Sequence, residues 1–127
     1  MRKAIVAGAW LVAFAPASLV AQTQTQMNAT AAAGWRAADA IMTREWRATY
    51  AYMKRLDAQD VSRGGGFGYA PATLTSQRAW LAFRDAQCAV EGGEFAGGSM
   101  QPLARERCLE RLTRGRTRQL QDLRWKR

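Results

Sequence analysis

The sequence predicts a small all-α domain, an antiparallel bundle of three main helices joined by one disulfide. Three observations predict this fold class. Apolar residues recur with the helical period in three separate stretches, glycine-rich segments separate these stretches, and no stretch alternates polar and apolar residues as a half-buried strand does. The two cysteines of the chain lie in the second and third stretches, so a bond between them would join two helices.

Residues 1–21 are predicted to be a signal peptide. Arg2 and Lys3 are followed by an apolar run over residues 4–14 and by small residues before a cleavage site after Ala21. The apolar run is short for a membrane span and leads into a polar segment, so we expect its removal and no membrane span in the mature chain. Residues 22–127 then form one helical domain, in the periplasm or secreted.

Export determines how the two cysteines are interpreted. In an oxidising compartment an even number of cysteines indicates disulfide bonding, and two cysteines allow only the pair Cys88 and Cys108. Closing this loop is expected to stabilise the fold by about 3 kcal/mol, mainly by restricting the unfolded chain.

The first helix is predicted to begin at Asn28, which can cap it, and to end near Leu56. Asp39 and Glu45 lie on the flanks of its apolar stripe, where a carboxylate can reach a basic residue of a neighbouring helix. The stripe itself consists of Ala31, Trp35, Ala38, Met42, Trp46, Thr49, Met53 and Leu56.

A glycine-rich connection is predicted from Asp57 to Pro71. It can be interpreted as a flexible linker between two helices. The alternative is a recognition loop, because Arg63, Phe67 and Tyr69 place one cation and two aromatic rings on it.

The second helix is predicted to begin near Thr73 or Thr75 and to end at Gly92 and Gly93. Two of its faces are apolar, so this helix is expected to pack between two others. One face carries Leu74, Trp80, Leu81 and Cys88, and the other carries Ala79, Phe83, Ala86 and Val90.

Two arginines are predicted to point into the bundle. Arg84 projects from the side of the second helix that should be buried, and Arg116 falls inside the leucine stripe of the third helix. A buried guanidinium has to be paired and hydrogen-bonded, because leaving it alone costs several kcal/mol. The candidate partners of Arg84 are Asp39, Glu45 and Asp85, and Arg116 is expected to need a carboxylate as well. We therefore predict an internal ion-pair network of Asp39, Arg84, Asp85 and Arg116.

The third helix is predicted to follow a glycine-rich loop over residues 91–100. Ser99 can cap this helix and Pro102 suits its first turn. Its apolar stripe consists of Leu109, Leu112, Leu120 and Leu123. On the opposite side lies a row of solvated basic residues, called here the arginine ridge, which consists of Arg107, Arg111, Arg114 and Arg118.

The net charge of +9 is concentrated near the C-terminus. Residues 105–127 contain nine basic and three acidic residues, whereas the rest of the mature chain is close to neutral. Any attraction for polyanions therefore belongs to the third helix. Nucleic-acid binding is not expected, because no helix-turn-helix, zinc or aromatic-strand pattern accompanies the ridge and the chain is exported. An anionic envelope polymer is the better partner for the ridge, and a merely solvated basic face is the simplest alternative.

The usual general bases and nucleophiles of enzymes are absent, which leaves only serines and carboxylates. There is no histidine, both cysteines are expected in the disulfide, and the serines have no nucleophile motif around them. The carboxylate pair Glu106 and Glu110 is interleaved with arginines, which is typical of a solvated ion-pair face. We expect no enzymatic activity, no metal site and no cofactor.

Several short motifs occur together in the second and third helices. They are Gln77-Arg78-Ala79-Trp80-Leu81, Phe83-Arg84-Asp85, Cys88, Gly97-Gly98-Ser99, Gln101-Pro102, Cys108, Leu112-Thr113 and Arg116. This set resembles the LprI-like lysozyme inhibitor domain. A weaker similarity at Met27-Asn28 and Ala38-Asp39 extends the resemblance over most of the mature chain.

The resemblance implies an exported binding protein that inhibits a lysozyme without covalent chemistry. The alternative is an envelope protein that binds an anionic polymer such as lipopolysaccharide through the arginine ridge. Because animal-type lysozymes are strongly basic, a contact with lysozyme is expected away from the ridge, on the two loops. The candidate contact residues are Arg63, Phe67, Tyr69, Glu94, Phe95 and Ser99.

Overall fold

The predicted all-α fold is confirmed. The computed structural model describes residues 17–62 and 64–125, and the side chains from residue 23 onward. Its elements are α1 (Ala17–Gln59), α2 (Tyr69–Gly93) and α3 (Gln101–Asp122), and the described residues contain no strand. None of the described helices is long and apolar enough to cross a membrane.

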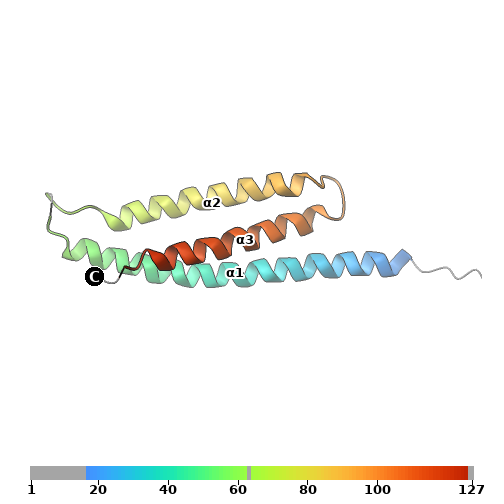
Figure 1. Ribbon diagram of the computed structural model, residues 1–127, viewed down its shortest axis with the longest axis horizontal. Helices are drawn as coiled ribbons and strands as arrows, with labels where there is room; N and C mark the ends of the chain where they lie inside the picture. The colour runs from blue at the N-terminus through green and yellow to red at the C-terminus, as the bar shows by residue number, and fades with distance from the viewer. Residues whose placement is uncertain (1–16, 63, 126–127) are drawn as a thin grey trace, which may run out of the picture.

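Consecutive helices run antiparallel, and α3 lies between α1 and α2 (Figure 1). The stripe predicted for the first helix faces the interior, where Ala38, Met42, Thr49 and Met53 are almost fully buried. From α3 the core receives Leu103, Leu109 and Leu120. The bundle is elongated, and the first turns of α1 extend past the connection between α2 and α3 (Figure 1).

The first helix begins earlier than its sequence signals indicate. It starts at Ala17, so Asn28 is not a cap but lies within α1. The Asn28 side chain instead donates to the Ser99 carbonyl oxygen at 3.2 Å, and Gln24 does the same at 3.3 Å. Most of the predicted signal peptide lies outside the described residues, and the predicted cleavage after Ala21 falls within the first turns of α1.

The second helix also begins earlier than predicted, at Tyr69, and Pro71 lies in its first turn. The Asp57 carboxylate supplies the cap from the end of α1, because it accepts the backbone N–H groups of Tyr69 at 2.6 Å and Ala70 at 2.8 Å. The predicted caps Thr73 and Thr75 lie inside the helix, where each hydroxyl donates to the carbonyl oxygen four residues earlier. Because Asp57 lies in the preceding helix, the first residues of α2 themselves carry no signal for this cap.

The prediction that α2 packs with two buried faces is wrong. The side with Gln77, Arg84 and Cys88 is buried against the other helices. On the opposite side Phe83 is 54% exposed and Val90 is 73% exposed. Helix α2 contacts both α1 and α3 with one side, so its opposite side is turned to solvent.

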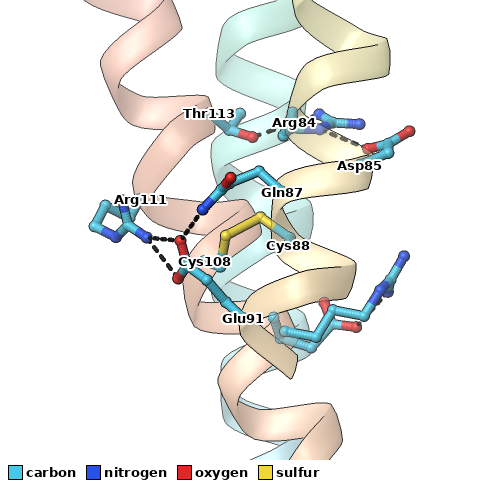
Figure 2. Close-up of a disulfide and its surroundings, with 10 residues drawn as sticks. Arg84, Asp85, Gln87, Cys88, Glu91, Cys108, Arg111 and Thr113 are labelled. Atoms are coloured by element: carbon cyan, nitrogen blue, oxygen red, sulfur yellow. Dashed lines mark hydrogen bonds and ion pairs between the residues drawn. A yellow bond between two sulfur atoms is a disulfide. The ribbon is translucent and has the colours of Figure 1, made fainter. Parts of the chain in front are cut away.

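The predicted disulfide joins Cys88 of α2 to Cys108 of α3, with an S–S distance of 2.06 Å and a Cα–Cα distance of 5.4 Å (Figure 2). Both cysteines are buried in a cluster with Leu109, and Trp35 and Leu112 pack against this cluster. The cross-link is therefore part of the hydrophobic core and holds the α2–α3 hairpin together.

The end of α3 is fastened to α1 by polar contacts. Thr49 donates to the Leu120 carbonyl oxygen at 2.7 Å, and Arg124 donates to Thr49 at 2.8 Å and to the Glu45 carboxylate at 2.6 Å. The hydrogen bond from Arg124 lowers the pKa of Glu45 below its ordinary value of 4.5, against the opposing effect of desolvation. Glu45 therefore pairs with Arg124 and not with Arg84.

The lowered pKa of Glu45 predicts a loss of stability in acid. A carboxyl with a lowered folded-state pKa stabilises the fold above its unfolded pKa, and this contribution is lost as the pH falls through the folded-state pKa. Glu45→Gln keeps the shape but removes the charge, so it should lower the free energy of unfolding at pH 7 by about 1 kcal/mol. Its stability should then depend less on pH below about pH 5 than that of the wild type.

Urea denaturation at several pH values measures this difference. Glu94→Gln is the matched control, because Glu94 is an exposed glutamate in the α2–α3 connection. If Glu45→Gln and Glu94→Gln had the same pH profile, the pair of Glu45 with Arg124 would not contribute to acid sensitivity.

Candidate functional site

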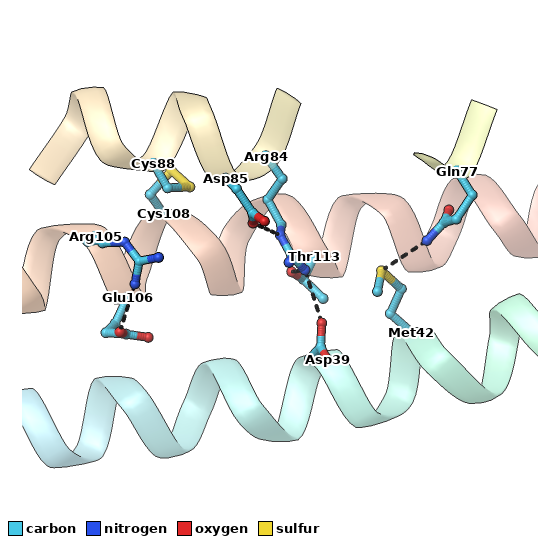
Figure 3. A network of polar contacts seen from close by, with 10 residues as sticks. All are labelled: Asp39, Met42, Gln77, Arg84, Asp85, Cys88, Arg105, Glu106, Cys108 and Thr113. Carbon is cyan, nitrogen blue, oxygen red and sulfur yellow. Dashed lines mark hydrogen bonds and ion pairs between the residues drawn. A yellow bond between two sulfur atoms is a disulfide. The ribbon is translucent and has the colours of Figure 1, made fainter. Parts of the chain in front are cut away.

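The Arg84 guanidinium lies where the three helices meet (Figure 3). Its Nη1 donates to Asp39 of α1 at 3.0 Å and to the Thr113 hydroxyl of α3 at 3.4 Å, while its Nε donates to Asp85 of α2 at 2.9 Å. Arg84 is only 6% exposed, and its guanidinium lies 5.2 Å from the centre of the Trp80 ring. One charged side chain thus joins all three helices, which is a structural role.

Arg116 also points inward, but the expectation of a carboxylate partner is wrong. Its Nε donates to Gln77 at 2.9 Å, and its two terminal nitrogens donate to Ser76 at 3.0 Å and Gln119 at 3.2 Å. No carboxylate of the described residues forms an ion pair with it. Burial lowers the pKa of Arg116, and three neutral acceptors together with the face of Trp80 satisfy the charge. Arg116 therefore does not belong to the Arg84 ion-pair network.

All four members of the arginine ridge are exposed on α3, but two of them are already paired. Arg111 donates to both Glu91 oxygens at 2.7 and 2.8 Å, and Gln87 also binds this carboxylate (Figure 2). These hydrogen bonds lower the pKa of Glu91, and those from Arg111 have the largest effect. Arg114 is paired with Glu110 at 2.7 Å.

Arg107 and Arg118 form no ion pair within the described part of the chain, so they are the free cations of the ridge. The four arginines and Glu110 line a shallow hollow of about 350 Å³. Glu110 is seated against α1 at Gly34, where an added Cβ would lie 2.7 Å from its Oε2. This glycine in the middle of a helix is the sequence signal for the close approach.

An aromatic group occupies the end of the bundle at the α1–α2 connection. The Phe67 and Tyr69 rings lie 4.8 Å apart, and Tyr69 contacts Trp125 edge-on at 6.3 Å. Phe67 is 62% exposed and Trp125 is 43% exposed. Of the three predicted loop residues, Arg63 lies outside the described residues. An open depression of about 770 Å³ adjoins this group and is lined by Tyr52, Leu56, Gln59, Asp60, Ser62, Tyr69 and Trp125.

The connection that carries Phe67 is ordered by Asp60. Its carboxylate accepts the backbone N–H of Ser62 at 3.0 Å, the Ser62 hydroxyl at 2.5 Å and the backbone N–H of Phe67 at 3.1 Å. Together with the Asp57 cap, these bonds tie the described residues of the connection to the end of α1.

The α2–α3 connection at the other end of the bundle carries the remaining predicted contact residues. Glu94, Phe95 and Ser99 are exposed, and Phe95 is 38% exposed. The hydrogen bonds from Gln24 and Asn28 fix the Ser99 carbonyl oxygen, so this loop is fastened to α1. Ser99 does not cap α3, since the capping position is Met100.

The sequence did not reveal some residues that shape these surfaces. Asp57 and Asp60 accept hydrogen bonds from the backbone that carries Phe67 and Tyr69, and Trp125 contacts the Tyr69 ring from the end of the chain. A weak signal for the two aspartates was present, because aspartate next to glycine-rich segments often accepts backbone N–H groups. The described residues contain no group of three histidine, cysteine, aspartate or glutamate side chains that could hold a metal ion.

The described residues form a small, disulfide-bonded domain of three helices with a basic hollow on α3 and an exposed connection at each end. A family profile described as "Lysozyme inhibitor LprI" matches residues 16–120. The chain therefore belongs to the LprI family. It is also 38% identical over 105 residues to a Rhizobium meliloti (strain 1021) protein named "Uncharacterized protein R02472", covering 81% of this chain and 75% of the relative. No solved structure shows significant similarity to the chain.

The position of Arg84 predicts that Arg84→Ala destabilises the domain. The substitution removes charged hydrogen bonds to two other helices and a contact with Trp80, so we expect a loss of about 3 kcal/mol in the free energy of unfolding. Arg118→Ala is the matched control, because Arg118 is exposed on α3 and should change stability by less than about 0.5 kcal/mol. Chemical denaturation measures both, and an unchanged midpoint for Arg84→Ala would refute this role.

Proposed function

We propose that this protein is an exported, non-enzymatic inhibitor that binds a lysozyme without covalent chemistry. The observation that carries the proposal is the match of the lysozyme inhibitor family profile over residues 16–120. The buried disulfide supports the exported location, because such bonds persist in oxidising compartments.

We place the contact with lysozyme at the aromatic end of the bundle. Aromatic side chains dominate the binding energy of many protein interfaces, and Phe67, Tyr69 and Trp125 lie together there. Asp57 and Asp60 hold the loop in place before binding, which lowers the entropy lost on association. The α2–α3 connection with Glu94, Phe95 and Ser99 is the alternative contact and has a smaller exposed aromatic surface.

Charge also favours a contact away from the arginine ridge. A strongly basic lysozyme would be repelled by Arg107 and Arg118, which have no acidic partner among the described residues. The ridge is one side of α3, whereas the aromatic group lies at the end of the bundle. Substituting the ridge should therefore leave inhibition unchanged or improve it.

Phe67→Ser should weaken inhibition by about tenfold or more if Phe67 is an anchor of the contact. Because Phe67 is 62% exposed, the fold should survive the substitution. Inhibition is measured by the clearing of a bacterial cell suspension by lysozyme. The matched control is Phe95→Ser at the opposite end.

Two results would contradict the proposal at different levels. A larger effect of Phe95→Ser than of Phe67→Ser would move the contact to the other loop. No inhibition by the wild type at micromolar protein would exclude lysozyme inhibition itself.

A second function is favoured by the hollow on α3. Arg107 and Arg118 are exposed cations at the edges of a surface that Arg111 and Arg114 also line, and such a surface fits the phosphates of an anionic polymer such as lipopolysaccharide. This function is independent of lysozyme inhibition.

Changing all four ridge arginines to glutamine should abolish binding to lipopolysaccharide. Wild-type binding should weaken roughly tenfold or more between about 50 and 200 mM salt, because several ion contacts are screened. The matched control removes the same charge from exposed positions of α1, with glutamine at Arg36, Arg44, Arg47 and Lys54. Equal losses of binding in both variants would mean that net charge alone, and not the ridge, accounts for the interaction. Binding that did not depend on salt would contradict the role of the ridge.

A further inference from the structure

The outer face of α2 is an apolar surface that no element of the described chain covers. Phe83 and Val90 are its large side chains, with 54% and 73% exposure. Between and beside them the exposed positions repeat at intervals of three and four residues, which keeps them on one side of the helix. The remaining members of this face are Ala72, Thr75, Ala79, Ala82, Ala86, Ala89 and Gly93, all exposed.

The residues beside this face make it complementary to itself. Arg78 and Asp85 lie seven residues apart on the same flank, and both are exposed. Arg78 has no ion-pair partner within the described residues. Asp85 uses Oδ1 for Arg84 and is 58% exposed, so its second oxygen can accept another donor.

A twofold axis near Ala82 would pair these two charged residues between two copies of the protein. When two copies of α2 cross antiparallel at this point, Arg78 of each copy lies opposite Asp85 of the other copy, because the midpoint between them falls beside Ala82. The two Phe83 rings come together across the axis on the other flank. The small side chains of Ala79 and Ala86 allow the helices to approach closely, at the short end of the usual 8–10 Å separation.

We propose that the protein forms a symmetric homodimer through the outer face of α2, with the two α2 helices antiparallel. The interface is isologous, since the same residues of both copies meet across the axis. A face of one helix is small for a protein interface, so the dimer should be weak, with a Kd between roughly 1 and 100 μM. The proposal does not depend on lysozyme inhibition.

Sedimentation equilibrium of the mature protein over a wide concentration range tests the proposal. The wild type should show a monomer–dimer equilibrium. Phe83→Glu places two like charges at the twofold axis and should weaken association at least tenfold. Val61→Glu is the matched control, because Val61 is 92% exposed in the α1–α2 connection and should not change association.

Cysteine cross-linking tests the direction of the helices. Position 82 lies beside the axis, so two molecules of the Ala82→Cys variant should form an intermolecular disulfide under mild oxidation. Ala72→Cys should not, because the two copies of this position would be separated by about 30 Å along an antiparallel pair. Cross-linking of both variants would indicate a parallel pair and overturn the proposed geometry.

A wild type that remains monomeric at roughly 0.5 mM, where a Kd near 0.1 mM would still be visible, would overturn the dimer. If such a monomeric protein lost lysozyme inhibition on Phe83→Glu, the face would belong to a lysozyme contact instead, and the dimer would again be excluded. Circular dichroism of each variant verifies that the helices are intact.

Discussion

The burial of one positive charge is the constraint on which the rest of the bundle depends. The Arg84 guanidinium is almost excluded from solvent, so protein acceptors have to replace water as its hydrogen-bond partners. These acceptors are Asp39 of α1, Asp85 of α2 and Thr113 of α3. The contact is satisfied only when all three helices have the correct register. One turn along α2, the bond from Cys88 to Cys108 fixes the register of α2 against α3 covalently. A small core thus obtains a single arrangement from one ion-pair cluster and one cross-link.

These interior contacts leave function to the surfaces. Arg84 lies on the buried side of α2, so the opposite side of this helix is turned to solvent. Likewise, Leu109 and Leu120 lie on the side of α3 that packs into the core, and the arginine ridge lies on the side that faces solvent. The loops at the two ends are held by side chains of α1, namely Asp57 at one end and Gln24 and Asn28 at the other. A long first helix therefore determines the shape of both ends.

The sequence was sufficient for those features that depend on local periodicity. The apolar stripe of α1, the pairing of Cys88 with Cys108 and the inward direction of Arg84 all follow from the helical period and from export. It was insufficient where a partner comes from far along the chain, as for the Asp57 cap of Tyr69 or the approach of Trp125 to Tyr69. For Arg116 the sequence was sufficient in part. The helical period placed its side chain inside the bundle, but it could not show that the neutral acceptors Gln77, Ser76 and Gln119 take the place of a carboxylate.

The proposed surfaces are compatible with one another in the proposed dimer. Helix α2 begins at the aromatic end and finishes at the α2–α3 connection, so an antiparallel pair of α2 helices brings the aromatic end of one copy to the side of the partner's α2–α3 connection. Both loops considered for lysozyme binding would then lie at each end of the assembly. The ridge on α3 would remain accessible, because the dimer uses the side of α2 that faces away from α1 and α3. Pairing two copies would thus present each surface twice, which strengthens binding to a partner with repeated sites without any new contact.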